Sequence, residues 1–338
     1  MPRGIFRLKQ VYEEQLSGEW STKEDVWNTL SPFAKAHSFG YFGGGSPSGP
    51  HQSTVDRIDY SSDTGTTPTK GPLSAARSYL ASTASASFGY FGGGPKFSSL
   101  STVDRIDYSN DTATASVRGP LSSARGQLSA TGNSSFGYFV GGGPPTVSTI
   151  DRIDYSNDTA TASTRGPNEY AQVDTAATGN ADFGYVGGGA EGAYTHVSRI
   201  DYSNDGAASI DKGNLSSGAY RGAATGNASF GYFGGGKHAP DPATAESRIS
   251  RIDYSNDTAV SVIKGPLSVA RWSLAATGDA NFGYFGGGAP SGKSTVDRLD
   301  YSNDTAAATV KGPLSAAKYC LAASSSRANA ILPENIVN

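Results

Sequence analysis

Short runs of five or six residues, rich in aromatic, β-branched or small side chains, recur along the chain between clusters of turn-forming residues. From Phe88 onward these runs read FGYFG, VDRIDY, TATASV and QLSAT, and they end at Gly-Gly, Ser-Asn-Asp, Gly-Pro and Gly-Asn. None of the runs has apolar positions at helical spacing. The pattern therefore predicts four short β-strands joined by turns.

This unit is repeated six times. The phrase FGYFGGG or a close variant begins at Phe39, Phe88, Phe136, Phe183, Phe230 and Phe282, at spacings of 49, 48, 47, 47 and 52 residues. A second phrase, DRIDYS, SRIDYS or DRLDYS, and a third, a basic residue before Gly, keep the same period. Four strands in about 48 residues are typical of one blade of a β-propeller.

The blades can also be oriented from composition. Strands near a propeller axis are crowded, so the run that contains Ala-Ala-Thr, as at Ala176–Thr178, is predicted to be innermost, and the Thr-rich run outermost. The chain starts its first blade at the aromatic strand and has one extra inner strand, Tyr319–Ser324, at its far end. We predict an all-β, six-bladed propeller over residues 37–324, closed by pairing of that last strand with the strand at Phe39.

An aromatic strand that ends in Gly-Gly, a variable loop, and a strand that ends in Tyr resemble the kelch motif over residues 37–324. Kelch repeats usually carry a Trp after that Tyr, whereas this chain has Thr67, Ala115, Ala162, Ser209, Ser261 and Ala308. The wording of the repeat also resembles repeat proteins of marine bacteriophages. That second resemblance implies a virion or tail-fibre component, located in the virion after assembly in the host cytoplasm.

Composition narrows the classes of function. The formal charge of −3, with acidic and basic residues interspersed, disfavours nucleic acid and anionic membranes as partners. The single cysteine, Cys320, excludes an internal disulfide framework and a multi-thiolate metal site. The N-terminus has no apolar stretch of signal-peptide length, and no run of about 18 apolar residues predicts membrane insertion. We expect no cofactor.

Two repeated motifs are candidates for functional sites. No helix is predicted after any Gly triplet, so these loops are not expected to bind phosphate. The Arg-x-Asp pairs place both side chains on one face of a strand, and one pair per blade indicates a structural ring that ties neighbouring blades or loops. Six equivalent anion sites are the alternative. The pairs are Arg57/Asp59, Arg105/Asp107, Arg152/Asp154, Arg199/Asp201, Arg251/Asp253 and Arg298/Asp300.

Evidence for catalysis is weak. The repeats contain few Glu residues, so a pair of glycosidase carboxylates has no clear candidates. The stretch SSDTGTT at 61–67 only partly matches the Asp-box turn of sialidases, and the four His residues are not clustered in the sequence. We expect a protein that is not an enzyme. A carbohydrate-active enzyme, such as a depolymerase with a site on the loops, is the alternative from another class.

Variation among the copies is concentrated in one loop. The segment after the glycines differs in every copy, while the Gly-Asn and Ser-Asn-Asp turns hardly change. Because strands alternate in direction, the variable loops and the Gly-Pro connections share one face. We predict recognition of a host-surface glycan or protein there, and neutral drift is the alternative. The candidate residues are His51, Phe97, Tyr194, His196 and His238.

Residues 1–36 have no repeat. Ser21 and Glu24 form a capping-box signature for a short helix, and the segment contains two of the three Trp residues. We predict an arm that attaches the propeller to other virion proteins or to copies of itself; a clasp against the propeller is the alternative, as is a purely structural decoration role for the whole protein. The candidate contact residues are Phe6, Leu8, Tyr12, Trp20 and Trp27, and residues 325–338 form a tail with either role.

Overall fold

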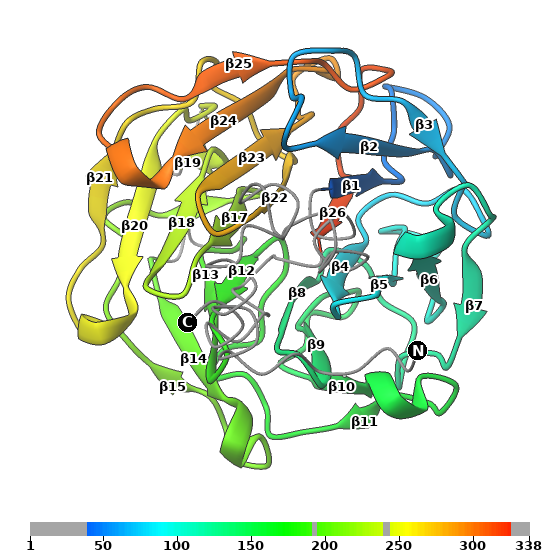
Figure 1. The fold of residues 1–338 in the computed structure, drawn as a ribbon. Helices are drawn as coiled ribbons and strands as arrows, with labels where there is room; N and C mark the ends of the chain where they lie inside the picture. The colour runs from blue at the N-terminus through cyan, green and yellow to red at the C-terminus, as the bar shows by residue number, and fades with distance from the viewer. Residues whose placement is uncertain (1–38, 191–194, 239–243, 326–338) are drawn as a thin grey trace, which may run out of the picture.

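Six four-stranded antiparallel sheets surround a central axis in the computed structural model, which describes residues 39–190, 195–238 and 244–325 (Figure 1). The predicted six-bladed β-propeller is confirmed. From the inner to the outer strand, blade 1 contains β26 (Ala322–Ser325), β1 (Phe39–Gly43), β2 (Val55–Asp59) and β3 (Thr69–Lys70). Blade 2 contains β4 (Ala81–Ala84), β5 (Phe88–Gly92), β6 (Val103–Asp107) and β7 (Ser116–Arg118).

The other four blades repeat this order. Blade 3 contains β8 (Ser129–Gly132), β9 (Phe136–Val140), β10 (Ile150–Asp154) and β11 (Ser163–Thr164). Blade 4 contains β12 (Ala176–Gly179), β13 (Phe183–Gly187), β14 (Val197–Asp201) and β15 (Ile210–Asp211). Blade 5 contains β17 (Ala223–Gly226), β18 (Phe230–Gly234), β20 (Ile249–Asp253) and β21 (Val262–Lys264). Blade 6 contains β22 (Ala275–Gly278), β23 (Phe282–Gly286), β24 (Val296–Asp300) and β25 (Thr309–Lys311).

The ring closes as predicted. Strand β26 pairs antiparallel with β1, in a register that sets Gly43 opposite Ala322 and Gly40 opposite Ser325. The strand starts later than the predicted Tyr319, because Cys320 has φ of 55°, a left-handed conformation that no strand residue adopts. The innermost strand of blade 1 is thus supplied by residues more than 250 positions from the rest of the blade.

The aromatic strands form the layer that packs between blades. In β5 the ring of Phe91 lies against Gly43 of blade 1, where an added Cβ would be 2.8 Å from that ring. The same Phe-on-Gly contact occurs at Gly92, Gly187, Gly234 and Gly286. Tyr41 stacks on Tyr108 of the next blade with centroids 4.9 Å apart, and equivalent Tyr pairs join the other five junctions. Aromatic packing is therefore present at each of the six junctions between blades.

The propeller has two different faces. The variable loops and the connections after the basic-Gly turn emerge together on what we call the loop face, at the ends of strands such as β1 and β3. The short Gly-Asn turns and the 3-10 turns lie at the opposite end, the constant face. These 3-10 turns are η1 (Tyr108–Asn110), η2 (Tyr155–Asn157), η3 (Tyr202–Asn204), η4 (Tyr254–Asn256) and η5 (Tyr301–Asn303). Within the described residues, no helix is long and apolar enough to cross a membrane.

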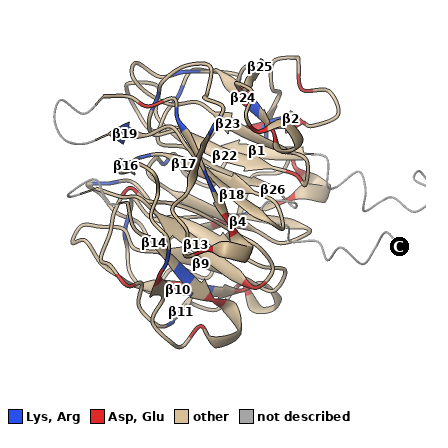
Figure 2. Cartoon of the chain, turned by 90° about the vertical axis from the view of Figure 1, so that its left-hand side faces the viewer, with Lys and Arg blue, Asp and Glu red and all other residues tan. Residues whose placement is uncertain are grey.

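One loop forms an additional ribbon. Strand β16 (Ala219–Tyr220) pairs with β19 (Lys237–His238), so the connection into blade 5 is joined to the variable loop of that blade. The side view places both strands at one end of the molecule, away from β26 (Figure 2). The described chain enters blade 1 at Phe39 and leaves it at Ser325, at the constant face.

Candidate functional site

The arginines of the Arg-x-Asp motif connect neighbouring blades. Arg105 Nη1 lies 2.7 Å from Oδ2 of Asp158, an aspartate in the Ser-Asn-Asp turn of the next blade, and Tyr90 donates a 2.9 Å hydrogen bond to the same oxygen. Arg118, from the basic-Gly turn, lies 3.7 Å from it. Each blade has this cluster around one turn aspartate, and these are Asp63, Asp111, Asp158, Asp205, Asp257 and Asp304.

The second residue of each motif has a different task. Asp107 accepts hydrogen bonds at 2.9 and 2.6 Å from the backbone N–H and the hydroxyl of Ser109, and so caps its own turn. Asp59, Asp154, Asp201, Asp253 and Asp300 do the same. The arginines therefore form the interblade ring together with the turn aspartates, while the aspartates two residues after them hold loops within their own blades. Since the guanidinium groups are occupied by carboxylates, the arrangement does not favour six anion sites.

The predicted recognition residues lie on the loop face but on separate blades. His51 Nδ1 is 2.9 Å from the hydroxyl of Ser78, and Phe97 is 89% exposed. The ring of His196 stacks on Tyr170 with centroids 4.6 Å apart, and His238 Nδ1 is 3.0 Å from the hydroxyl of Ser217. The structure does not bring these four side chains together. Tyr194 lies outside the described residues, as do the arm residues Phe6, Leu8, Tyr12, Trp20 and Trp27.

A different set of residues converges at the axis. One residue per blade connection, just before the inner strand, has positive φ between 53° and 59°. Such values are uncommon for residues other than Gly and are enriched at functional sites. We call these six residues the axial ring, and they are Tyr79, Gln127, Asp174, Arg221, Ser273 and Cys320.

The axial ring is closed by its own backbone. Each N–H donates to the carbonyl of the preceding member: Gln127 to Tyr79 at 2.9 Å, for example, and Tyr79 to Cys320 at 2.9 Å. Six such bonds run around the axis without a gap. The left-handed conformation turns each N–H and carbonyl toward its neighbours in the ring. The hydrogen bonds formed in this way offset the cost of the conformation, which is about 1 kcal/mol or more for a residue other than Gly. The ring thus fixes six side chains around one opening.

Three members form a polar network. Asp174 Oδ2 accepts a 2.8 Å hydrogen bond from Gln127 Nε2 and a 2.9 Å bond from Arg221 Nε. Burial acts to lower the pKa of Arg221, but the Asp174 carboxylate outweighs it and leaves the pKa raised. Because only Nε of Arg221 is used in this bond, its two Nη groups remain available for a ligand that contains oxygen acceptors.

The opposite side of the ring is less polar. Burial, together with the neighbouring Cys320, raises the pKa of Tyr79. Burial also raises the pKa of the Cys320 thiol, which therefore stays protonated near neutral pH. A protonated thiol is a poor nucleophile, so this ring supplies hydrogen-bonding and apolar contacts rather than an activated attacking group.

A pocket lies on the axis beside the ring. Its volume is about 130 Å³, and its wall consists of the axial ring, four leucines and the small residues at the start of the six inner strands, such as Ala81, Ala130 and Ala276. The pocket has space for a small polar group from the loop face. No group of three or more His, Cys, Asp or Glu residues suited to a metal ion occurs among the described residues.

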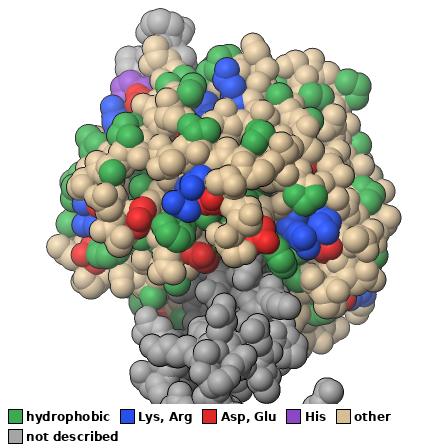
Figure 3. All heavy atoms as spheres, turned by 45° about the horizontal axis from the view of Figure 1, so that its top comes forward, with side chains coloured by type: hydrophobic (Ala, Val, Ile, Leu, Met, Phe, Trp, Pro, Cys, Tyr) green, Lys and Arg blue, Asp and Glu red, His purple; other side chains and the backbone are tan. Residues whose placement is uncertain are grey.

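The six copies contained a signal for this site. Next to the constant inner strand, one position is occupied by Tyr, Gln, Asp, Arg, Ser and Cys in the six copies, a different residue each time. Comparing the variable loops alone misses it, because the position lies in the connection after the basic-Gly turn. On the outer surface of the propeller, charged and hydrophobic side chains are interspersed (Figure 3).

The comparisons with known proteins concern the fold. No family model and no curated protein matches the chain. Among 573 matching solved chains is one described as "Structure of YjhT", with a TM-score of 0.61, 10% identity, and coverage of 75% of this chain and 88% of the other. At that identity the similarity shows a shared propeller fold, and a fold hosted by so many chains does not specify an activity.

Proposed function

We propose that this protein is a non-enzymatic recognition module whose loop face, centred on the axial ring, binds a polar ligand on a surface, with a host-cell glycan as the favoured class. The observation that carries the proposal is the ring itself. A framework that repeats six times places six different side chains in one backbone conformation around one opening. Binding residues are commonly found on such connections, held by a rigid scaffold.

The chemistry of the ring suits a sugar. The hydrogen-bond donors of Arg221 and Gln127 and the hydroxyl of Ser273 can address hydroxyl groups, and Tyr79 offers an aromatic face. The Asp174 carboxylate is already engaged by two donors and partly neutralised, so it orients its neighbours and does not act as a free acid or base. This arrangement favours binding without reaction.

The placement of the two ends of the described chain supports the rest of the proposal. Phe39 and Ser325 lie at the constant face, so attachment through residues 1–36 would leave the loop face free. We infer that the module belongs to the kelch type and is displayed on a bacteriophage particle, attached through the arm to other virion proteins. This part rests on the resemblance of the repeats.

Binding to a glycan array tests the ligand class. Wild-type protein is expected to bind one group of glycans, and Asp174→Asn is expected to weaken that binding about tenfold, because the ring loses a charge-assisted hydrogen bond. Asp182→Asn, a matched change at an exposed position on the constant face, should have no effect. Equal binding by wild type and Asp174→Asn would contradict the proposed site, and release of sugar fragments would contradict the non-enzymatic role.

Attachment is tested separately. Protein lacking residues 1–36 is expected to fold with an unchanged melting temperature but to be absent from assembled particles. Exchange of residues 46–55 for the corresponding loop of another blade should change adsorption and leave incorporation intact. Incorporation of the truncated protein at the wild-type level would refute the role of the arm.

A further inference from the structure

A buried cation lies near the start of most blades. Arg77, in the connection into blade 2, is fully buried and pairs with the fully buried Asp104, the residue before the arginine of the Arg-x-Asp motif. The equivalent pairs are Arg125–Asp151 at 3.0 Å, Arg271–Asp297 at 3.0 Å and Lys318–Asp56 at 2.9 Å. We call this location the buried-cation position.

Two blades depart from this pattern, and both partners change together. In blade 4 the cation is replaced by Gln172 and its aspartate by Ser198, and in blade 5 the replacements are Ala219 and Ser250. The equivalence is structural, because the carbonyls of Arg77 and Ala219 accept the same backbone bond, from Gly45 and Gly189 respectively. A buried carboxylate without its cation would be costly, so its loss accompanies the loss of the cation.

The amide in blade 4 shows what a neutral occupant does. Gln172 Nε2 donates a 3.1 Å hydrogen bond to the carbonyl of Gly188. In other blades a guanidinium group reaches the same carbonyl, as Arg125 Nε does to Gly141 at 2.8 Å. In blades 2, 3 and 4, therefore, a side-chain N–H at this position meets the same backbone carbonyl, with or without a charge.

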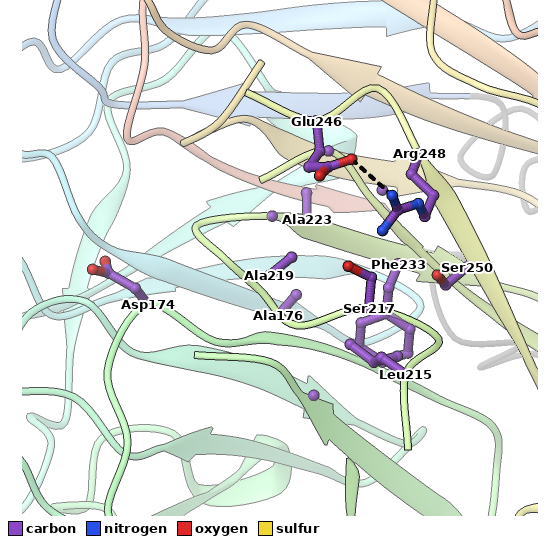
Figure 4. A pocket seen from close by; sticks show the side chains of 14 residues that line it. Asp174, Ala176, Leu215, Ser217, Ala219, Ala223, Phe233, Glu246, Arg248 and Ser250 are labelled. Carbon is purple, nitrogen blue, oxygen red and sulfur yellow. Dashed lines mark ion pairs between the residues drawn. The ribbon is translucent and has the colours of Figure 1, made fainter. Parts of the chain in front are cut away.

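In blade 5 the space is open. Ala219 is too short to reach the corresponding carbonyl of Gly235, which accepts no hydrogen bond among the described residues. A cavity of about 30 Å³ remains beside Leu215, Phe233 and Ser250 (Figure 4). That volume is room for about two water molecules, or for the end of an amide group.

The rim of the cavity is polar. Arg248 Nη2 lies 3.5 Å from Glu246 Oε2, and the two side chains form an ion pair, which the dashed line in Figure 4 marks. At the floor the Ser250 hydroxyl is 3.0 Å from that of Ser216, at a position where four of the other five blades have a carboxylate. The interior thus offers acceptors but no uncompensated negative charge, which favours a neutral donor over a cation.

We propose that this cavity is a binding site for a neutral amide group, supplied by an N-acetylated sugar or an amide side chain of a ligand on the loop face. The amide N–H would donate to the Gly235 carbonyl, as Gln172 does to Gly188 within the chain. The larger ligand rests on the proposed recognition function, whereas the amide site is a property of the isolated protein and can be tested alone.

The test is a titration of the full-length protein with acetamide, followed by NMR of alanine methyl groups. The methyls of Ala219 and Ala223, which both line the cavity, are expected to shift and saturate at millimolar acetamide. Guanidinium at the same concentrations should not saturate them. N-acetylglucosamine should shift the same methyls, and glucose should not if the amide is the recognised group.

Variants make the assignment specific. Ala219→Gln fills the cavity with the amide found in blade 4 and should weaken acetamide binding at least tenfold, read at Ala223, without lowering the melting temperature. Ala316→Gln, at an exposed position of another connection, is the matched control. Absence of saturable shifts, shifts that persist in Ala219→Gln, or equal binding of guanidinium would each overturn the proposal, and none of these results depends on whether a glycan is the ligand of the axial ring.

Discussion

The residue that contributes most to the junctions is the turn aspartate. In each junction one carboxylate accepts from a buried tyrosine hydroxyl and from an arginine of the preceding blade, as Asp158 does from Tyr90 and Arg105. The arginine also covers a phenylalanine ring, with the guanidinium of Arg105 4.1 Å from the centre of Phe88. Loss of the carboxylate would leave a phenol and a guanidinium group without their shared acceptor.

We therefore expect Asp158→Asn to lower the free energy of unfolding by about 2 to 3 kcal/mol, because the amide has no charge to pair with the guanidinium group and its NH2 cannot accept a hydrogen bond from either partner. Chemical denaturation measures this change. The control is Asp182→Asn, whose carboxylate is exposed. A loss of less than about 0.5 kcal/mol, typical of surface changes, would show that the cluster does not hold the junction.

The same carboxylates predict how stability depends on pH. Burial alone would raise the pKa of Asp257, but hydrogen bonds from Lys212 and Tyr185 and the charge of Arg199 outweigh it and lower the pKa; Asp304 is lowered in the same way. A lowered pKa in the folded state means that the stabilisation is complete above the unfolded-state value of about 3.9. It is lost as the pH falls through the folded-state pKa.

Denaturation curves between pH 7 and pH 2 should accordingly show stability falling below about pH 4. The double variant Asp257→Asn/Asp304→Asn should be less stable at pH 7 and should have a shallower fall. If stability fell equally steeply with pH in wild type and in the double variant, these two carboxylates would not be responsible for the loss of stability at low pH.

At the scale of the strand, the critical element is β26. It is short, with only Ala322–Ser325 in the ladder, yet it supplies the innermost strand of blade 1 and packs beside β4 and β22 of the two neighbouring blades. Because the strand comes from the far end of the chain, the ring cannot close until nearly all of the chain is present. Long-range closures of this kind are slow to form and make the fold cooperative.

Truncation after Cys320 is expected to abolish cooperative unfolding, because β1 would lose its inner partner, β26. Truncation after Ser325 retains β26 and is the matched control, expected to melt as the full-length protein does. Circular dichroism on heating distinguishes the two. A sharp melting transition in the shorter protein would show that five complete blades and a partial one suffice.

The repeat allowed the strands and blades to be predicted from the sequence, but not the axial ring or the buried-cation position. Periodic phrases identified the six blades, the inner and outer strands and the closure, since strand patterns and turns are local. The axial ring and the buried-cation position depend on backbone conformation and on contacts across blades. The buried-cation position did leave a signal in the sequence, because Ser198 and Ser250 replace aspartates in the two blades that lack the cation. The start of β26, just after Cys320, could not be predicted, because a left-handed φ at a residue other than Gly has no signature in the sequence.

In the molecule as a whole, the repeated structural turns and the variable residues lie on opposite faces of the closed propeller. The constant face carries repeated turns capped by aspartates, and both ends of the described chain are located there. The loop face carries the axial ring, the variable loops and the blade 5 cavity. A rigid ring of six blades can therefore vary one face without changing its packing, as a recognition scaffold requires.

Recognition through the axial ring can be tested most directly by hydrogen exchange measured with and without the glycan selected on an array. We expect slower exchange confined to the loop face, in the connections that contain Tyr79, Asp174 and Arg221, and no change in the turns of the constant face. Protection confined to the constant face, or the same protection in Asp174→Asn as in wild type, would contradict it.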